Sequence, residues 1–211
     1  MAVRILKTVG LIGLFVYLFY LIGLNLFFKR WGTTDREWNA VYPGDSLLQS
    51  LTYSNIRAIT IRAPASAIMP WLKQLGIRKA GLYSYDGLEN LLGLNVHSAD
   101  RILPRYQHIR LGDTLLLGPM GGPRLVAIQE NRHLLFYTGA NQEFQNSWLF
   151  YLVPQPDGST RLLTVYRMYY PPTVANFVIW RMVTEPAHFI MEWKMLRGIR
   201  DRAEKNHRTR S

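Results

Sequence analysis

The sequence predicts an α+β domain in which a long C-terminal helix lies across an antiparallel sheet, preceded by one N-terminal transmembrane helix. Three observations lead to this prediction. An uncharged apolar run fills residues 9–28, several β-branched segments fill residues 111–170, and residues 186–205 repeat apolar side chains at helical spacing. A run of strands followed by one long helix, without regular alternation, favours an antiparallel sheet covered by that helix.

The N-terminal run Val9–Phe28 reads VGLIGLFVYLFYLIGLNLFF and carries no charge. About 20 apolar residues, each rising about 1.5 Å, cross a hydrocarbon core of about 30 Å. We therefore predict that residues 1–30 form a single-pass membrane anchor, with the bilayer as a partner. A cleaved signal peptide is the alternative, but it would have a shorter apolar core and a small-residue cleavage site. Cations flank both ends of the run, and the basic residues after it favour a cytoplasmic domain.

The composition narrows the classes of function. The chain has 25 Lys and Arg against 14 Asp and Glu, and it has no cysteine. Disulfides, thiolate metal sites and cysteine nucleophiles are therefore excluded. Cations are scattered along the chain, apart from a basic C-terminal tail that we place at residues 207–211, and no nucleic-acid-binding motif is visible. We expect no nucleic-acid partner.

The first half of the predicted domain follows a linker at residues 31–54. A strand is expected at residues 55–63, followed by a helix at residues 64–76 with Pro64 in its first turn and Gly76 at its end. A short helix is expected from Gly87 to residue 92. In that helix Asp86 would be the N-cap, Glu89 would complete a capping box, and Gly93 would end it.

The second half is expected to consist of strands and one helix. Five strands are predicted here. They are Leu111–Leu117, Leu125–Ile128, Leu134–Thr138, Ser147–Val153 and Thr160–Tyr170, with a hairpin turn at Pro156–Ser159. The last helix would span residues 186–205 with Thr184 as its cap. Between them, residues 171–183 are apolar and are interpreted as a packed loop, a lid over a cavity or a membrane-interface segment.

Five segments of the chain carry a resemblance to a known superfamily. They read AITIRAPASAIMPWLKQLG, AGLYSYDGLENLLG, HSADRILP, SWLFYLVPQPDGSTRLL and EPAHFIMEWKMLRGI. Together they resemble the START-like (SRPBCC) superfamily, which includes lipid-transfer and polyketide cyclase/dehydrase-like proteins, over residues 55–206. The resemblance implies a helix-grip fold, a curved sheet gripping a long helix with a cavity between them. It further implies that the cavity binds a hydrophobic small molecule or lipid. It does not imply catalysis.

Candidate ligand-binding residues follow from that expected cavity. They are Trp71, Tyr83, Tyr85, Trp148, Arg167 and His188. Arg167 would face inward with Phe150, Leu152, Leu163 and Val165, although a shift of one residue in register would reverse its direction. We expect no cofactor and no metal, because His97 and Asp100 alone offer too few donors. Tyr85→Ala is expected to weaken ligand retention more than Glu89→Ala.

Two other functions stay open at this point. An enzyme of the cyclase or hydrolase kind would use His97 or His188 as one partner in acid–base chemistry. Its carboxylate would be Asp86, Glu89 or Asp100. A structural or partner-binding membrane protein would instead use the basic tail and residues 171–183, and a cavity too small for a ligand would favour it.

Overall fold

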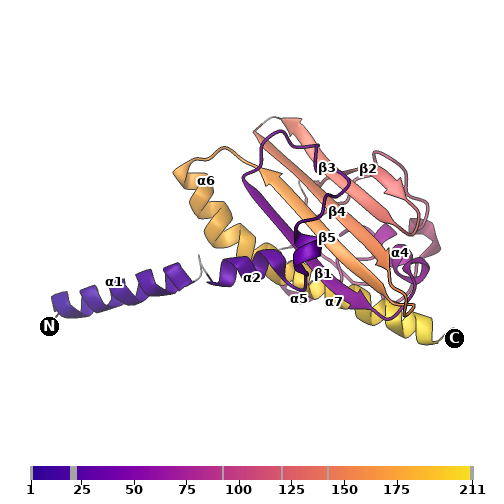
Figure 1. The fold of residues 1–211 in the computed structure, drawn as a ribbon, viewed down its shortest axis with the longest axis horizontal. Coiled ribbons are helices and arrows are strands. Elements are labelled where there is room, and N and C mark those ends of the chain that lie inside the picture. The colour runs from indigo at the N-terminus through magenta and orange to yellow at the C-terminus, as the bar shows by residue number, and fades with distance from the viewer. Residues whose placement is uncertain (1, 20–22, 92, 120, 142, 210–211) are drawn as a thin grey trace.

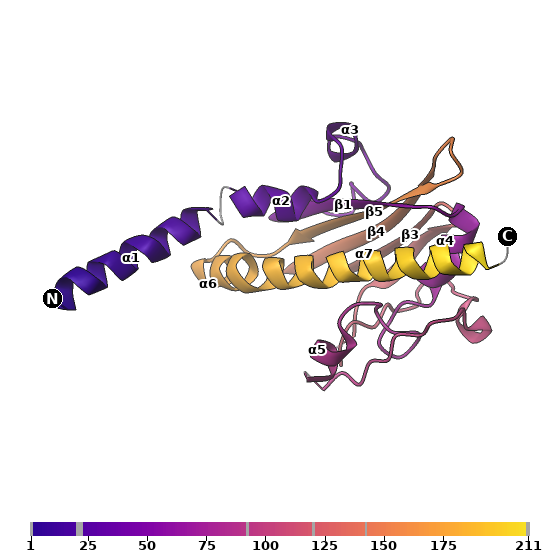
Figure 2. The ribbon, with the colours of Figure 1, turned by 90° about the horizontal axis from the view of Figure 1, so that it is seen from below.

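The computed structural model describes residues 2–19, 23–91, 93–119, 121–141 and 143–209. A five-stranded antiparallel sheet in the order β1-β5-β4-β3-β2 carries a long helix, α7, across one face (Figures 1 and 2). The strands are β1 (Tyr53–Ile61), β2 (Arg124–Gln129), β3 (His133–Asn141), β4 (Phe144–Pro154) and β5 (Thr160–Tyr169). The predicted architecture, an antiparallel sheet with a long C-terminal helix across it, is confirmed.

The helices lie around this sheet. They are α1 (Ala2–Phe19), α2 (Asn25–Arg30), α3 (Asp35–Trp38), α4 (Ala65–Lys73), α5 (Asp86–Leu91), the 3₁₀ turn η2 (Pro104–Tyr106), α6 (Val174–Val178), the π-helical segment η3 (Ile179–Thr184) and α7 (Glu185–Arg208). Figure 2 shows α7 along one face of the sheet, with α5 and its neighbouring loops on the same side and α3 on the other.

The two faces of the sheet bury two separate apolar clusters. On the α7 face, Phe150 and Leu162 pack with Leu196 of the helix. On the opposite face, Leu163 and Val165 pack with Tyr42, so residues 31–52, predicted to be a linker, cover that face. Successive strand residues point to opposite faces, and therefore each strand contributes to both clusters.

The central hairpin has a sequence cause. Strands β4 and β5 pair from Gln145 opposite Tyr169 to Pro154 opposite Thr160. Gly158 in the connecting turn has φ +81°, which an L side chain rarely adopts, so glycine suits this position. The hairpin turn predicted at Pro156–Ser159 is therefore confirmed.

Helix α7 packs close to the loop that precedes α5. A Cβ added to Gly198 would lie 2.3 Å from the carbonyl oxygen of Tyr83, so only glycine lets helix and loop approach this closely. The start of α7 differs from the prediction. Thr184 makes no capping bond, because η3 runs directly into α7 and the backbone there is already helical.

Two further sequence predictions are corrected. The predicted strand Leu111–Leu117 is irregular and forms only an isolated bridge between Thr114 and Arg124. The apolar segment 171–183, which included a loop among its interpretations, is helical in α6 and η3. Leu115 of the first segment is buried, whereas most apolar side chains of the second segment, such as Val174 and Val183, are exposed.

Two described helices, α1 and α2, overlap the predicted membrane segment Val9–Phe28. Helix α1 ends at Phe19, residues 20–22 lie outside the described residues, and α2 packs on the domain with Phe28 stacked on Phe189 at 4.3 Å. Within the ranges given above, no helix combines the length and the apolar character needed to cross a membrane.

Candidate functional site

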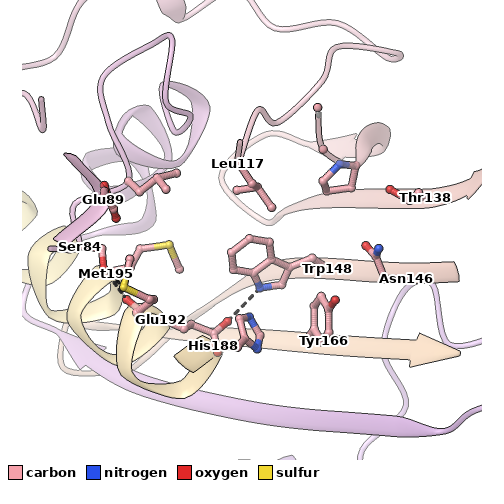
Figure 3. Close-up of a pocket in the computed structure, with 15 residues that line it drawn as sticks. Ser84, Glu89, Leu117, Thr138, Asn146, Trp148, Tyr166, His188, Glu192 and Met195 are labelled. Carbon is pink, nitrogen blue, oxygen red and sulfur yellow. Dashed lines mark hydrogen bonds between the residues drawn. The ribbon is translucent and has the colours of Figure 1, made fainter. Parts of the chain in front are cut away.

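A pocket of about 480 Å³ lies between the sheet and the N-terminal half of α7, and Glu89 of α5 and Leu117 also line it (Figure 3). Its lining is mostly apolar. The lining residues are Leu82, Ser84, Glu89, Leu117, Gly121, Gly122, Pro123, Thr138, Asn146, Trp148, Tyr166, His188, Met191, Glu192 and Met195. The pocket is therefore lined by three strands, the long helix, α5 and neighbouring loop residues.

Aromatic rings form the floor of this cavity. Trp148 of β4 and Tyr166 of β5 lie edge to face, with ring centroids 6.1 Å apart. His188 of α7 lies against both rings, at 5.7 Å from Trp148 and 4.6 Å from Tyr166. Such contacts hold the three side chains in fixed positions, so the cavity has a preformed wall for an apolar molecule.

A buried ion pair supports the same wall. Arg57 of β1 and Glu192 of α7 pair with each other, and both side chains are fully buried. The second carboxyl oxygen of Glu192 accepts a 2.9 Å hydrogen bond from the indole nitrogen of Trp148, and Arg57 Nε donates to the carbonyl oxygen of Phe28 at 2.7 Å. Burial is the largest influence and would raise the pKa of Glu192, but the charge and hydrogen bond of Arg57, with smaller contributions from His188 and Thr164, together hold that pKa below its ordinary value.

His188 is neutral at physiological pH. Burial lowers its pKa to about 4, because the charged imidazolium would lose its hydration in this setting, and the nearby carboxylate of Glu192 offsets this only in part. The sequence suggested contact between these two residues, which lie one helical turn apart. In the structure Glu192 pairs with Arg57 and Trp148 instead, which leaves the His188 ring to the cavity.

Glu89 is the unusual carboxyl of the cavity. Only 1% of its surface is exposed, and neither carboxyl oxygen has a hydrogen-bond partner among the described residues. Burial, followed by the neighbouring carboxylate of Asp86, raises the pKa of Glu89 to about 7 against a smaller opposing contribution from the Ser84 hydroxyl. The hydroxyl itself donates to the carbonyl oxygen of Met191 at 3.0 Å.

The capping box predicted for this short helix is wrong. The Asp86 carboxylate accepts hydrogen bonds from the backbone nitrogen of Ser98 at 2.7 Å and from its hydroxyl at 2.6 Å, so it ties α5 to the following loop. Glu89 points into the cavity rather than back to the helix start. The helix is described as far as Leu91, the predicted end at residue 92 lies outside the described residues, and Gly93 has a positive φ of +78°.

The structure brings two of the six predicted ligand-binding residues into the cavity, Trp148 and His188. Trp71 and Tyr83 are buried in the core beside it, with ring centroids 5.8 Å apart. The Tyr83 hydroxyl there accepts a 2.7 Å hydrogen bond from the Gln74 amide.

The other two candidates lie outside the cavity lining. Tyr85 is half-buried, with the Lys194 ammonium 5.8 Å from its ring centroid. Arg167 lies on the opposite face of the sheet and pairs with Asp45 at 2.9 Å. Its inward orientation was predicted from a register one residue away from the observed one. Leu163 and Val165 share its face, whereas Leu162 and Tyr166 face α7.

Some of the residues proposed for acid–base chemistry line the cavity, and others lie outside it. His97 is exposed, and Asp100 pairs with Arg202 at 3.1 Å; neither lines the cavity. His188 and Glu89 both line it, on opposite sides in Figure 3. Within the described residues, no group of three or more His, Asp or Glu side chains is arranged to hold a metal ion.

Several lining residues were not found from the sequence. Tyr166, Thr138 and Asn146 occupy strand positions on the α7 face, and the loop 117–123 contributes Leu117 and Pro123. Tyr166 could have been found by placing Leu162 instead of Leu163 on the inward face of β5, since alternation then places Tyr166 inward. The loop carries no periodic pattern, so its position depends on the packed structure.

A second, smaller hollow of about 100 Å³ lies on the η3 side of Tyr166 and His188. Tyr166 and His188 border both spaces, and Trp180 of η3 stacks on Tyr170 at 5.5 Å on the far side. The rings of Tyr166 and His188 therefore lie between the main cavity and η3.

Comparison with known proteins gives a limited result. No family model matches the chain, and no curated protein matches it. Similar solved structures include protein MLL2253 from Mesorhizobium loti, with 15% identity, a TM-score of 0.42, and coverage of 72% of this chain and 98% of that one. The di-domain ARO/CYC StfQ from the steffimycin biosynthetic pathway has 10% identity, a TM-score of 0.42, and coverage of 74% and 52%. CalU16 from Micromonospora echinospora has 16% identity, a TM-score of 0.33, and coverage of 72% and 84%. Similarity at this level does not indicate a function for this chain.

Proposed function

We propose that this domain binds a hydrophobic small molecule or lipid in the cavity between the sheet and α7. The observation that carries the proposal is the cavity itself: about 480 Å³, lined mostly by apolar side chains, with a few polar groups at fixed positions. Pockets of this size and composition are typical of small-molecule sites. Burial of apolar ligand surface, at about 25 cal/mol per Å², would supply the affinity.

Blocking the cavity tests this proposal. Purified full-length chain is denatured and extracted, and the extract is examined by mass spectrometry for a stoichiometric apolar compound. Leu117→Trp places an indole in the cavity from a residue outside the strands and α7, whereas Leu111→Trp adds the same indole at an exposed position outside it. We expect the compound in the wild type and in Leu111→Trp and its loss in Leu117→Trp. Equal recovery from both variants would overturn the proposal.

Membrane anchoring is a separate part of the proposal. It is supported by the uncharged run Val9–Phe28 and by exposed apolar side chains on α6 and η3, among them Val174, Ile179 and Val183. The smaller hollow beneath η3 borders the cavity, so a ligand held in a bilayer would have a short route inward. Extraction of cell membranes with alkaline carbonate tests this: the full chain should stay in the pellet, and its release would reject the anchor without affecting the cavity.

A further inference from the structure

The charged groups of the cavity are not equivalent. Glu192 is neutralised by the buried guanidinium of Arg57, and His188 is uncharged. Among the described residues that line the cavity, Glu89 is the carboxyl left without a cation. In a chain with a net charge of +11, the uncompensated charge of this cavity is therefore negative.

The two oxygens of Glu89 set the kind of group that would satisfy them. Both are buried acceptors without a donor. A buried acceptor without a donor has lost its hydration without replacement, so a ligand that supplies donors is favoured at this place. A hydroxyl group has one O–H to donate, whereas a primary ammonium has three N–H groups and also carries the opposite charge. The carboxylate of Asp86 beside Glu89 adds to the negative potential.

The opposite part of the cavity suits an apolar body. The rings of Trp148 and Tyr166 line it, whereas Met191 lies beside Ser84, with its sulfur 3.6 Å from the serine hydroxyl. Glu89 and Ser84 lie at one side of the cavity, and the rings of Trp148 and Tyr166 lie at the other side, together with Thr138 and Asn146 (Figure 3).

We propose that the ligand is an amphiphilic amine: a compact apolar body with a protonated amino group that pairs with Glu89. This inference rests on the proposed binding function and specifies its ligand class. The ammonium group would lie between α5 and α7, and the apolar body would lie against Trp148. Pairing requires the ionised carboxylate, so affinity for an amine rises as the pH increases through neutrality.

Three matched probes test the ligand class on the full chain: adamantane bearing a methylamine, a methanol or a carboxylic acid group. Isothermal titration calorimetry measures each dissociation constant at about pH 6 and about pH 8, with blank titrations into the same buffer and detergent. We expect the amine to bind at least about tenfold more tightly than the alcohol at the higher pH, and its affinity to fall at the lower pH. The acid probe would show the opposite pH dependence.

Glu89→Gln keeps the shape of the side chain and removes its charge, and it should abolish the preference for the amine. Glu130→Gln is the control, since Glu130 is exposed, pairs with Lys73 and lies outside the cavity lining. Equal or tighter binding of the alcohol or the acid by the wild type would overturn the amine proposal while the binding function stands. Failure of all three probes to bind would count against both. Comparison of the wild type at two pH values does not depend on the variant folding.

Discussion

Replacement of Glu89 by Gln should stabilise the ligand-free protein at high pH and leave it unchanged at low pH. The pKa of Glu89 rises from 4.5 to about 7 in the folded state, so the folded state holds its proton more tightly than the unfolded state. The stability that the protonated Glu89 carboxyl contributes is therefore fully present below about pH 4.5 and is lost as the pH rises through about 7. Glutamine does not titrate, so the variant avoids that loss.

The magnitude follows from the same values. A rise from 4.5 to about 7, at about 1.4 kcal/mol per pKa unit, corresponds to roughly 3 kcal/mol. The carboxyl borders a cavity that water can enter, and screening reduces this to about 2 kcal/mol. Urea unfolding of the wild type and the variant at about pH 4 and about pH 8 measures the difference. Parallel stability curves for the two proteins would refute the reasoning, because they would mean that Glu89 titrates as an exposed carboxyl does.

Three further predictions concern packing and ligand contact. Arg57→Met leaves Glu192 buried without its cation and should lower the free energy of unfolding, measured in urea, by about 3–5 kcal/mol. Arg57→Met combined with Glu192→Leu should recover most of that loss, and a double variant as unstable as the single one would contradict the pairing. Glu89→Ala should weaken retention of a bound ligand more than Tyr85→Ala, the reverse of the order expected from sequence, because Glu89 lines the cavity; ligand recovery by mass spectrometry decides the order. Gly198→Ala should lower the melting temperature, although alanine ordinarily favours helices by about 1 kcal/mol, because its Cβ would overlap a backbone carbonyl of the loop before α5; an unchanged or higher melting temperature would show that the loop can move away.

The elements with strong local signals were predictable from the sequence. Strand β1 before Pro64, the β4–β5 hairpin and helix α7 each combine a hydrophobic period with turn or end residues. In segment 111–117 the hydrophobic period and the turn residues do not agree on one element. Its leucines predicted a strand, but the segment is an irregular loop. Hydrophobic content alone does not distinguish a buried strand from a buried loop.

The cavity was predictable only in part, for two physical reasons. Trp148 and His188 were found because large and titratable side chains on regular elements are conspicuous in a sequence. Arg167 was placed on the wrong face because a one-residue shift in register exchanges the two faces of a strand. Glu89 was interpreted as a cap, since a capping box and a buried carboxyl share the same local spacing and only tertiary packing separates them.

The most direct test of ligand binding in the cavity is an NMR experiment on full-length protein labelled with ¹³C at its methionine methyl groups. Met191 and Met195 line the cavity, whereas Met69 is buried in the core outside it. With each signal assigned by a Met→Leu variant, titration with adamantane methylamine should shift the Met191 and Met195 signals and leave Met69 unmoved. Saturable binding that leaves Met191 and Met195 unshifted would contradict the account, because the molecule would then occupy another site.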